Sequence, residues 1–145
     1  MKTSHIVNLR PLCRAFCTAL VGIAALLATP RLATAQIYVS EQEGTVGEYD
    51  ATTGTAIDAN FITGLSGSEG IALSGNDLFV GNGSNRISEY NATTGAVISA
   101  NFITGLNDPA GIVVSGNNLY VTNNYAGSTW VGEYNATTGA TINAD

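Results

Sequence analysis

The side chains that could carry out chemistry are divided unevenly along the chain. The first 35 residues contain the only lysine, the only histidine and both cysteines: Lys2, His5, Cys13 and Cys17. Residues 36–145 contain all 11 carboxylates but a single cation, Arg86. In this longer part, carboxylates are therefore the only groups suited to acid and base catalysis or to Ca²⁺ binding.

Glu48, Glu89 and Glu133 recur at one position of an internal repeat, and they are the main candidates for such chemistry. A functional interpretation makes them a ring that binds Ca²⁺, or an acid and base pair of the glycosidase kind. The structural interpretation, which we favour, is an exposed polar position on an outer strand, repeated because the whole unit was duplicated.

The first 35 residues have the organisation of a secretory signal peptide. Basic residues precede an apolar run, residues 15–28, that is too short to span a bilayer comfortably. The small residues of Ala33-Thr34-Ala35 then suit signal peptidase. We therefore expect cleavage after Ala35, which would leave residues 36–145 as a secreted chain in the periplasm or at the cell surface.

Removal of this segment excludes several mechanisms. Without His, Cys or Lys, the mature chain cannot build a Ser-His-Asp triad, a Cys-His pair, a Schiff base or a zinc site of His and Cys ligands. Its 11 carboxylates and one cation give a net charge near −10 (1 − 11), which repels nucleic acid and anionic lipid. We therefore expect a non-enzymatic protein that has no cofactor, with Ca²⁺ as the open alternative, and that binds neither nucleic acid nor membrane.

An internal repeat dominates the mature chain. Residues 48–82 align without gaps to residues 89–123, with 22 of 35 positions identical and a period of 41 residues. A third copy begins at Glu133, offset by 44 residues because the preceding loop is longer. Such self-similarity indicates an architecture in which each copy is one structural unit.

Each copy contains four short segments with strand character, separated by turn residues. In the unit of residues 66–106, the predicted strands are residues 70–74, 77–82, 86–91 and 96–103. The first turn, Gly75-Asn76, suits a two-residue hairpin, and the Asn-Ala-Thr-Thr-Gly turn combines an Asn cap with a left-handed Gly. Four antiparallel strands in about forty residues are typical of a propeller blade.

We therefore predict an all-β fold, a β-propeller-like array of four-stranded antiparallel blades, with a β-sandwich as the alternative. The blade parts are residues 36–65, 66–106 and 107–145; the first has three strands and the last ends inside its fourth. Closed propellers have about four to eight blades. We expect an incomplete propeller, either a truncated fragment, which we favour, or a chain that assembles with others into a ring.

The repeat resembles a known family. The segments 109–114, 118–123 and 131–135 resemble the NHL and YVTN repeat pattern of Pro-x-Gly-Ile, a polar turn and Leu-Tyr-Val, although Glu69 stands where Pro109 stands in the next copy. The strings Glu-Tyr-Asn-Ala-Thr-Thr-Gly and Ala-Asn-Phe-Ile-Thr-Gly-Leu resemble those of exported bacterial propellers associated with PEP-CTERM sorting. This resemblance implies an exported bacterial β-propeller.

An insertion breaks the repeat in the loop that runs from Asn123 to Trp130, where we expect a ligand site. Its residues Asn123, Asn124, Tyr125 and Trp130 combine amide and aromatic side chains, which suit a sugar or a protein surface. The favoured function is a non-enzymatic extracytoplasmic propeller module for binding or scaffolding. The alternatives are a carboxylate- or Ca²⁺-dependent enzyme of the gluconolactonase kind and a lectin whose chains assemble into a ring.

An incomplete propeller would also leave apolar residues without a neighbouring blade. We expect this of residues on its first and last sheets: Ile37, Val39, Ile112 and Val114. Such open blade faces predict self-association of the chain.

Overall fold

The computed structural model describes residues 35–83, 85–125 and 127–144, with the side chain of Tyr125 left out. The predicted signal peptide and its cleavage site, apart from Ala35, lie outside these residues. All regular secondary structure within them is β-strand, which confirms the predicted all-β class. Within the same ranges, no helix has the length and hydrophobicity needed to cross a lipid bilayer.

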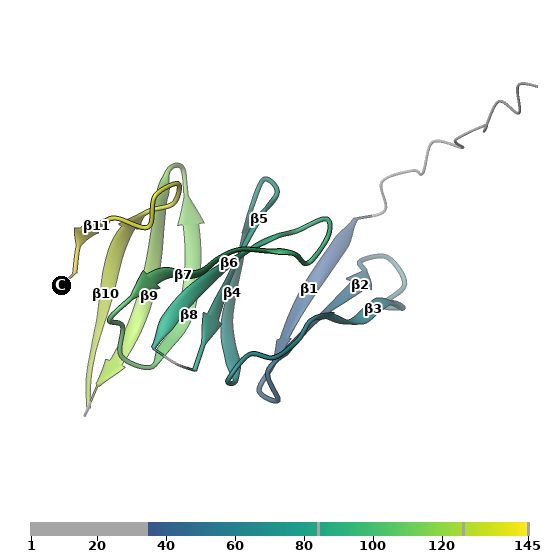
Figure 1. The fold of residues 1–145 in the computed structure, drawn as a ribbon, viewed down its shortest axis with the longest axis horizontal. Helices are drawn as coiled ribbons and strands as arrows, with labels where there is room; N and C mark the ends of the chain where they lie inside the picture. The colour runs from purple at the N-terminus through teal and green to yellow at the C-terminus, as the bar shows by residue number, and fades with distance from the viewer. Residues whose placement is uncertain (1–34, 84, 126, 145) are drawn as a thin grey trace, which may run out of the picture. The chain divides into compact units, whose positions relative to one another are not determined.

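The described strands form three antiparallel sheets (Figure 1). The first sheet contains β1 (Gln36–Glu41), β2 (Thr45–Asp50) and β3 (Ala56–Ile62). The second contains β4 (Ser68–Ser74), β5 (Asp77–Asn82), β6 (Arg86–Asn91) and β7 (Val97–Thr104). The third contains β8 (Pro109–Ser115), β9 (Asn118–Tyr125), β10 (Ser128–Asn135) and β11 (Thr141–Asn143). Each sheet is a meander in which strands follow one another in chain order, as the repeat predicts.

The strand register repeats with the sequence. Tyr38 pairs with Glu48 in the first sheet, and Phe79 pairs with Glu89 in the second, 41 residues later. β1, β2 and β3 are therefore the counterparts of β5, β6 and β7. In the described part of the chain, the first sheet has no counterpart of β4 or β8.

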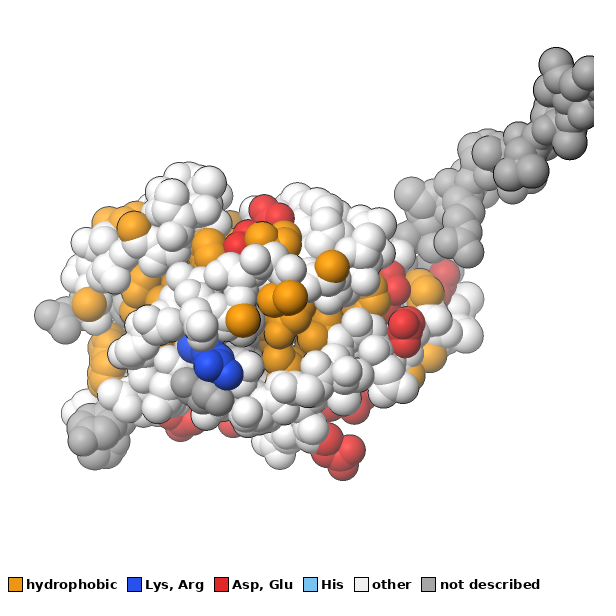
Figure 2. All heavy atoms as spheres, in the orientation of Figure 1, with side chains coloured by type: hydrophobic (Ala, Val, Ile, Leu, Met, Phe, Trp, Pro, Cys, Tyr) orange, Lys and Arg blue, Asp and Glu red, His pale blue; other side chains and the backbone are white. Residues whose placement is uncertain are grey.

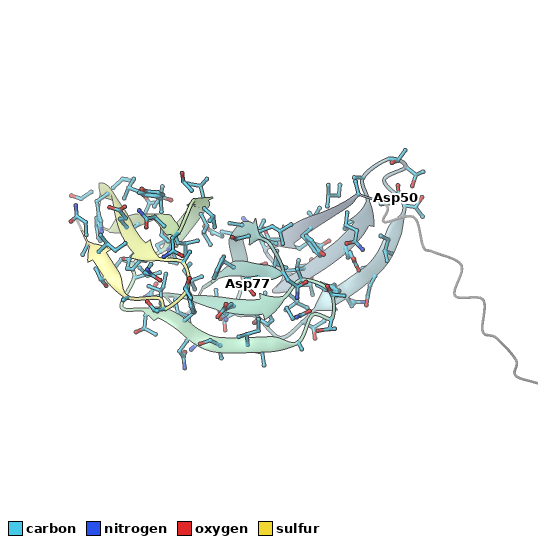
Figure 3. All side chains as sticks on the ribbon, turned by 90° about the horizontal axis from the view of Figure 1, so that it is seen from above. Asp50 and Asp77 are labelled. Carbon is cyan, nitrogen blue, oxygen red and sulfur yellow. The ribbon has the colours of Figure 1, made fainter. Side chains whose placement is uncertain are left out.

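The turns have the predicted chemistry. Gly75 and Gly116, in the two-residue hairpins, have φ angles of 60° and 59°, which favour glycine. In the longer hairpin, Oδ1 of Asn91 accepts hydrogen bonds from the backbone N–H groups of Thr93 and Thr94, both at 3.0 Å. Asp50, labelled in Figure 3, takes the same role in the first sheet. These hydrogen bonds to its carboxylate hold the pKa of Asp50 below its ordinary value.

The hydrophobic core lies between successive sheets. One cluster joins the first and second sheets and contains Val46, Ile62, Leu65, Leu78, Val80 and Ala92. A second cluster joins the second and third sheets and contains Phe79, Ile87, Ile103, Leu106, Leu119, Val121 and Tyr134. Because side chains alternate along a strand, β5 directs Leu78 and Val80 to the sheet before it and Phe79 to the sheet after it. The second sheet thus uses both of its faces for packing against its neighbours.

The face of the first sheet that turns away from the second is open. Ile37 and Val39 are 47% and 42% exposed there, whereas their counterparts Leu78 and Val80 are fully buried. Figure 2 shows hydrophobic side chains, in orange, at several places on the surface. The expectation for Ile112 and Val114 was wrong: both pack against the cluster between the second and third sheets. The neighbour between them, Val113, points the other way and is exposed.

Close packing of β4 against β8 depends on a glycine. A Cβ atom at Gly70 would collide with the carbonyl oxygen of Ala110, whereas one at the equivalent Gly111 would meet only the side chain of Thr122, at 3.1 Å. We expect Gly70→Ala to lower the free energy of unfolding by about 1–3 kcal/mol, the usual cost of overpacking, and Gly111→Ala to cost less. Urea denaturation of both variants measures this, and equal losses would contradict the proposed role of the β4–β8 contact.

Candidate functional site

The strand connections gather at two ends of the sheets, because antiparallel strands turn alternately at one end and the other. We call one end the hairpin end. It holds the Gly-Asn turns and the Asn-Ala-Thr-Thr-Gly hairpins, including the hairpin of the first sheet, in which Asp50 takes the place of the asparagine. The other, the cleft end, holds the β1–β2 and β5–β6 turns and the connections between sheets, β3–β4 and β7–β8.

Polar groups at the hairpin end bond to one another in a repeated pattern. Oγ1 of Thr93 donates to Oδ1 of Asn76 at 2.7 Å, and Oγ1 of Thr137 donates to Oδ1 of Asn117 at 2.9 Å. The backbone bond from Ala92 to the carbonyl of Asn76 also recurs in the third sheet. The repeated residues at this end are therefore explained by turn structure.

The cleft end contains a cavity of about 300 Å³. Its lining comes from the β1–β2, β3–β4, β5–β6 and β7–β8 connections and from the strands β4, β5 and β8, and it consists of Gln42, Ser66, Gly67, Ser68, Glu69, Gly81, Gly83, Asp108 and Pro109. Glycines bring these backbones together: a Cβ at Gly83 would collide with the carbonyl oxygen of Ser66. The cleft is therefore built from close backbone approach rather than from large side chains.

Two exposed carboxylates, Glu69 and Asp108, lie in the lining of this cleft. Asp108 has a φ of 45°, a left-handed conformation that is uncommon for residues other than glycine. Its backbone N–H donates to Oδ1 of Asn85 at 3.1 Å, which helps to hold that conformation. A negatively charged, polar cleft of this kind suits a ligand with cationic or hydroxyl groups.

Other polar groups in the lining have structural partners. Oγ of Ser68 donates to the carbonyl of Glu41 at 2.8 Å, and the carbonyl of Glu69 accepts from Oγ of Ser40 at 3.0 Å. Both bonds join the first sheet to β4. They fix the position of the backbone that carries the Glu69 side chain.

The predicted ligand loop lies at the same end of the sheets as this cleft, but its residues have different roles. Asn123 is buried; its Oδ1 accepts from the N–H of Asn107 at 3.1 Å, as Oδ1 of Asn82 accepts from Ser66 at 3.2 Å. Asn123 and Asn82 thus have the same structural role: each joins its own sheet by a hydrogen bond to the connection that follows the preceding sheet.

The other three predicted residues lie at the β9–β10 hairpin. Asn124 is exposed, accepts from Oγ1 of Thr129 at 2.8 Å and donates its N–H to the carbonyl of Asn107 at 2.9 Å. Trp130 is half-buried and lies opposite Asn123 in the sheet, while the backbone of Tyr125 ends β9. The link from Asn124 to Asn107 connects this hairpin to the segment that carries Asp108.

The recurrent glutamates are not on exposed positions, contrary to the prediction. Glu48 and Glu89 are 6% and 9% exposed, because each lies on the sheet face that packs against the next sheet. Glu133 lies on the third sheet, where its Oε1 accepts from Nδ2 of Asn118 at 2.7 Å and from the hydroxyl of Tyr120 at 2.9 Å. The three carboxylates therefore belong to three different sheet faces. Among the described residues, no group of three or more potential metal ligands comes together.

Burial changes the acidity of two of these glutamates. It raises the pKa of Glu48 and of Glu89 above the ordinary value, and the charges of Asp58 and Asp77 (Figure 3), respectively, raise them further. Both side chains are thus partly desolvated acids in the interior of the stack.

Sequence reasoning missed Glu69 and Asp108. Residues 66–69 differ from residues 107–110 at all four positions, although the flanking Phe-Ile-Thr-Gly-Leu and Gly-Ile strings are identical. Variable connections on a repeated scaffold are where binding residues concentrate. This difference between the two copies was the signal in the sequence that could have pointed to Glu69 and Asp108.

The stacked antiparallel sheets define the β-propeller class, and comparisons with known proteins agree. The chain matches the family described as "Outer membrane protein assembly factor BamB" over residues 18–100 and 42–142. These matches cover more than half of the sequence, so the chain belongs to this β-propeller repeat family.

Solved structures show the same fold. A chain of Kuenenia stuttgartiensis hydrazine synthase superposes with a TM-score of 0.65 and 20% identity, over 75% of this chain and 32% of that one. A chain of the nidogen/laminin complex gives 0.61 and 24%, over 76% and 44%. Saccharomyces cerevisiae Sqt1 gives 0.60 and 14%, over 73% and 30%. The chain spans less than half the length of each, and the likeness shows the fold alone. No curated protein matches the sequence.

The buried glutamates predict an unusual pH dependence. Because the pKa of Glu89 is higher in the folded protein than its ordinary value of about 4.5, the folded state binds more protons above that pH, and stability falls as the pH rises through the window. We expect Glu89→Gln to raise the melting temperature at about pH 8 and to have a smaller effect at about pH 5. The control is Glu43→Gln, at an exposed turn position. The same shift in both variants, or a larger gain at the lower pH, would refute this account.

Proposed function

We propose that this chain is a non-enzymatic, extracytoplasmic β-propeller module that binds a partner at its cleft end. The observation that carries the proposal is the difference between the two ends of the sheets. Repeated side chains bond to one another at the hairpin end, whereas the cleft end has a cavity with the exposed carboxylates of Glu69 and Asp108. Presentation of variable connections on a rigid scaffold is a common basis of recognition.

The charge of the chain favours particular partners. Residues 36–145 contain 11 carboxylates and one cation, so a partner with Lys or Arg side chains is attracted and an anionic partner is repelled. A protein surface with basic residues fits this charge best. A carbohydrate, recognised through its hydroxyl groups, is the second ligand class that the polar cleft accommodates, and it corresponds to the lectin alternative.

The proposed location follows from the predicted signal peptide and is supported by the family, whose description names an outer membrane protein assembly factor. We also propose that the repeat is of the NHL and YVTN type and that the chain is related to exported propellers associated with PEP-CTERM sorting. Because the chain spans less than half the length of the hydrazine synthase, nidogen/laminin and Sqt1 chains, we propose that it forms one part of the binding surface of a complete propeller.

A non-enzymatic role is supported by the positions of the carboxylates. An acid and base pair or a Ca²⁺ ring needs carboxylates that converge on one space. Glu48 and Glu89 are buried against different neighbouring sheets, and the oxygen of Glu133 is bonded within the third sheet. These positions suit buried polar residues of a scaffold better than a shared active site.

Calcium distinguishes the module from the carboxylate enzyme. We expect Ca²⁺ at about 1 mM to leave the melting temperature unchanged, because Glu48, Glu89 and Glu133 lie on different sheet faces and no three potential ligands come together among the described residues. Differential scanning calorimetry with and without Ca²⁺, with Mg²⁺ as the control ion, makes the measurement. A Ca²⁺-specific rise that Glu89→Gln abolishes would favour the enzyme instead.

Site-specific crosslinking tests the proposed binding end. A photoreactive amino acid replaces Ser66 in the cleft lining or, as the control, Ala96 near a hairpin; both positions are exposed and keep their backbone hydrogen bonds. We expect a crosslinked protein partner in intact cells from position 66 only. Glu69→Gln combined with Asp108→Asn should lower the yield at least about threefold, while Asp58→Asn, an exposed carboxylate outside the cleft, should not.

The outcomes separate the ligand classes. Equal crosslinking from positions 66 and 96, or a yield that ignores the cleft carboxylates, would overturn the proposed site. Binding on a glycan array that depends on the same two carboxylates, without a protein crosslink, would assign a carbohydrate ligand and favour the lectin.

A further inference from the structure

Arg86, the single cation of residues 36–145, begins β6 at the cleft end and is half-buried. Its Nη1 donates to Oδ1 of the exposed Asn101 at 3.2 Å. Its Nε is buried without a hydrogen-bond partner among the described residues, and none of their carboxylates forms an ion pair with it. The guanidinium group has therefore lost hydration that its contacts within the chain replace only in part.

The repeat shows that the scaffold does not require an arginine at this position. Thr45 occupies the equivalent position of β2, and Trp130 that of β10, because all three residues pair with corresponding positions of the preceding strand. The same place in the sheet thus accepts a hydroxyl, a guanidinium or an indole group. A side chain that varies on a repeated scaffold is a candidate for recognition rather than for folding.

A hydrogen bond that the preceding copy cannot make joins the Arg86 turn to the cleft. Oδ1 of Asn85 accepts from the backbone N–H of Asp108 at 3.1 Å. With φ angles of 58° and 45°, these two are the only non-glycine residues of the described ranges with a positive φ. Their counterparts one copy earlier are Gly44 and Gly67, with φ angles of 87° and 91°. Side chains therefore stand in this contact at two positions where the backbone favours glycine.

Side chains in the left-handed region are concentrated at functional sites, because glycine adopts this region without strain. Here the side chain of Asn85 holds the segment that carries Asp108 against the turn that leads into β6. The carboxylate of Asp108 is exposed and lines the cleft. The cleft end thus combines anionic groups with the one cation of this part of the chain.

We propose that Arg86 is the specificity-determining residue of the cleft end and binds an aspartate or glutamate side chain of the protein partner. This inference rests on the proposed function and adds to it the charge pattern of the partner, which is a basic group for Glu69 and Asp108 and an acidic group for Arg86. A planar guanidinium group matches a carboxylate through parallel N–H···O hydrogen bonds.

The net charge of the chain makes this recognition selective. At long range, 11 carboxylates against one cation attract a partner whose surface is basic overall. At short range, a basic partner without a carboxylate in the correct place would cover Arg86 and leave it without a counter-ion, which costs binding energy. Arg86 therefore discriminates among basic partners rather than attracting them.

Crosslinking in intact cells tests this role, with the photoreactive amino acid at position 66 of the full 145-residue chain. We expect Arg86→Gln to lower the yield of the protein crosslink at least about fivefold. Arg86→Lys keeps the charge but not the planar group, so its yield should lie between those of the other two chains. Because Thr45 and Trp130 show that the position accepts neutral side chains, Arg86→Gln should leave the melting temperature of the exported protein nearly unchanged.

Two further variants separate a local contact from net charge and from folding. Arg86→Gln combined with Ala96→Lys restores the net charge at an exposed position near a hairpin, and the yield should stay low. Asn85→Gly copies the preceding sheet and removes the acceptor of the Asp108 N–H. It should lower the yield without lowering the melting temperature, since glycine suits the left-handed backbone.

A charge exchange identifies the group that Arg86 binds. Mass spectrometry of the crosslinked product locates the aspartate or glutamate of the partner nearest to the crosslink. Its replacement by arginine should lower the yield with the unchanged chain and raise it at least about threefold with Arg86→Glu.

The outcomes distinguish this inference from the proposed function. Equal yields from the unchanged chain and Arg86→Gln, recovery of the yield by Ala96→Lys, or a charge exchange without effect would overturn the role of Arg86 and leave the binding end in place. No protein crosslink from position 66 of the unchanged chain would overturn both. Binding of an acidic polysaccharide that requires Arg86, without a protein crosslink, would assign the carboxylate to a carbohydrate and also overturn the proposal.

Discussion

Every sheet in this protein depends on its neighbours for burial. The two hydrophobic clusters lie between sheets, and side chains that alternate along a strand are divided between the cluster before and the cluster after. Between the second and third sheets, the close contact of β4 with β8 is possible because Gly70 leaves space for the carbonyl of Ala110. Stability is therefore a property of the stack, as in other repeat proteins, and a single sheet has no core of its own.

This constraint also determines where function can be placed. Sheet faces inside the stack are used for packing, even at positions occupied by Glu48 and Glu89, whose burial raises their pKa values. Recognition is left to the ends of the strands and to any edge or face that lacks a neighbour. The cleft lined by Glu69 and Asp108 is a feature of the first kind.

Sequence analysis predicted the features that depend on local chemistry. Turns at Gly75 and Asn91, strand positions and the repeat register all follow from residues close together in the chain, and the structure confirms them. Sequence analysis failed for residues whose burial depends on which sheet covers which face. Period-two alternation shows that Glu89 and Ile112 point to one side of a strand, but not whether another sheet lies there. The cleft was missed for a related reason, because its lining comes from different copies of the repeat.

The repeat also separates residues that build the scaffold from residues that are free to change. Asn123 was predicted to bind a ligand because it lies beside an insertion. Asn82 makes the same hydrogen bond one repeat earlier, so both residues have a structural role. Residues 66–69 and 107–110 differ at every position while the strings on either side are identical. Ser66, Gly67, Asn107 and Asp108 lie outside the strands, so changes at these positions can alter the chemistry of the cleft end and leave the strand pairing intact.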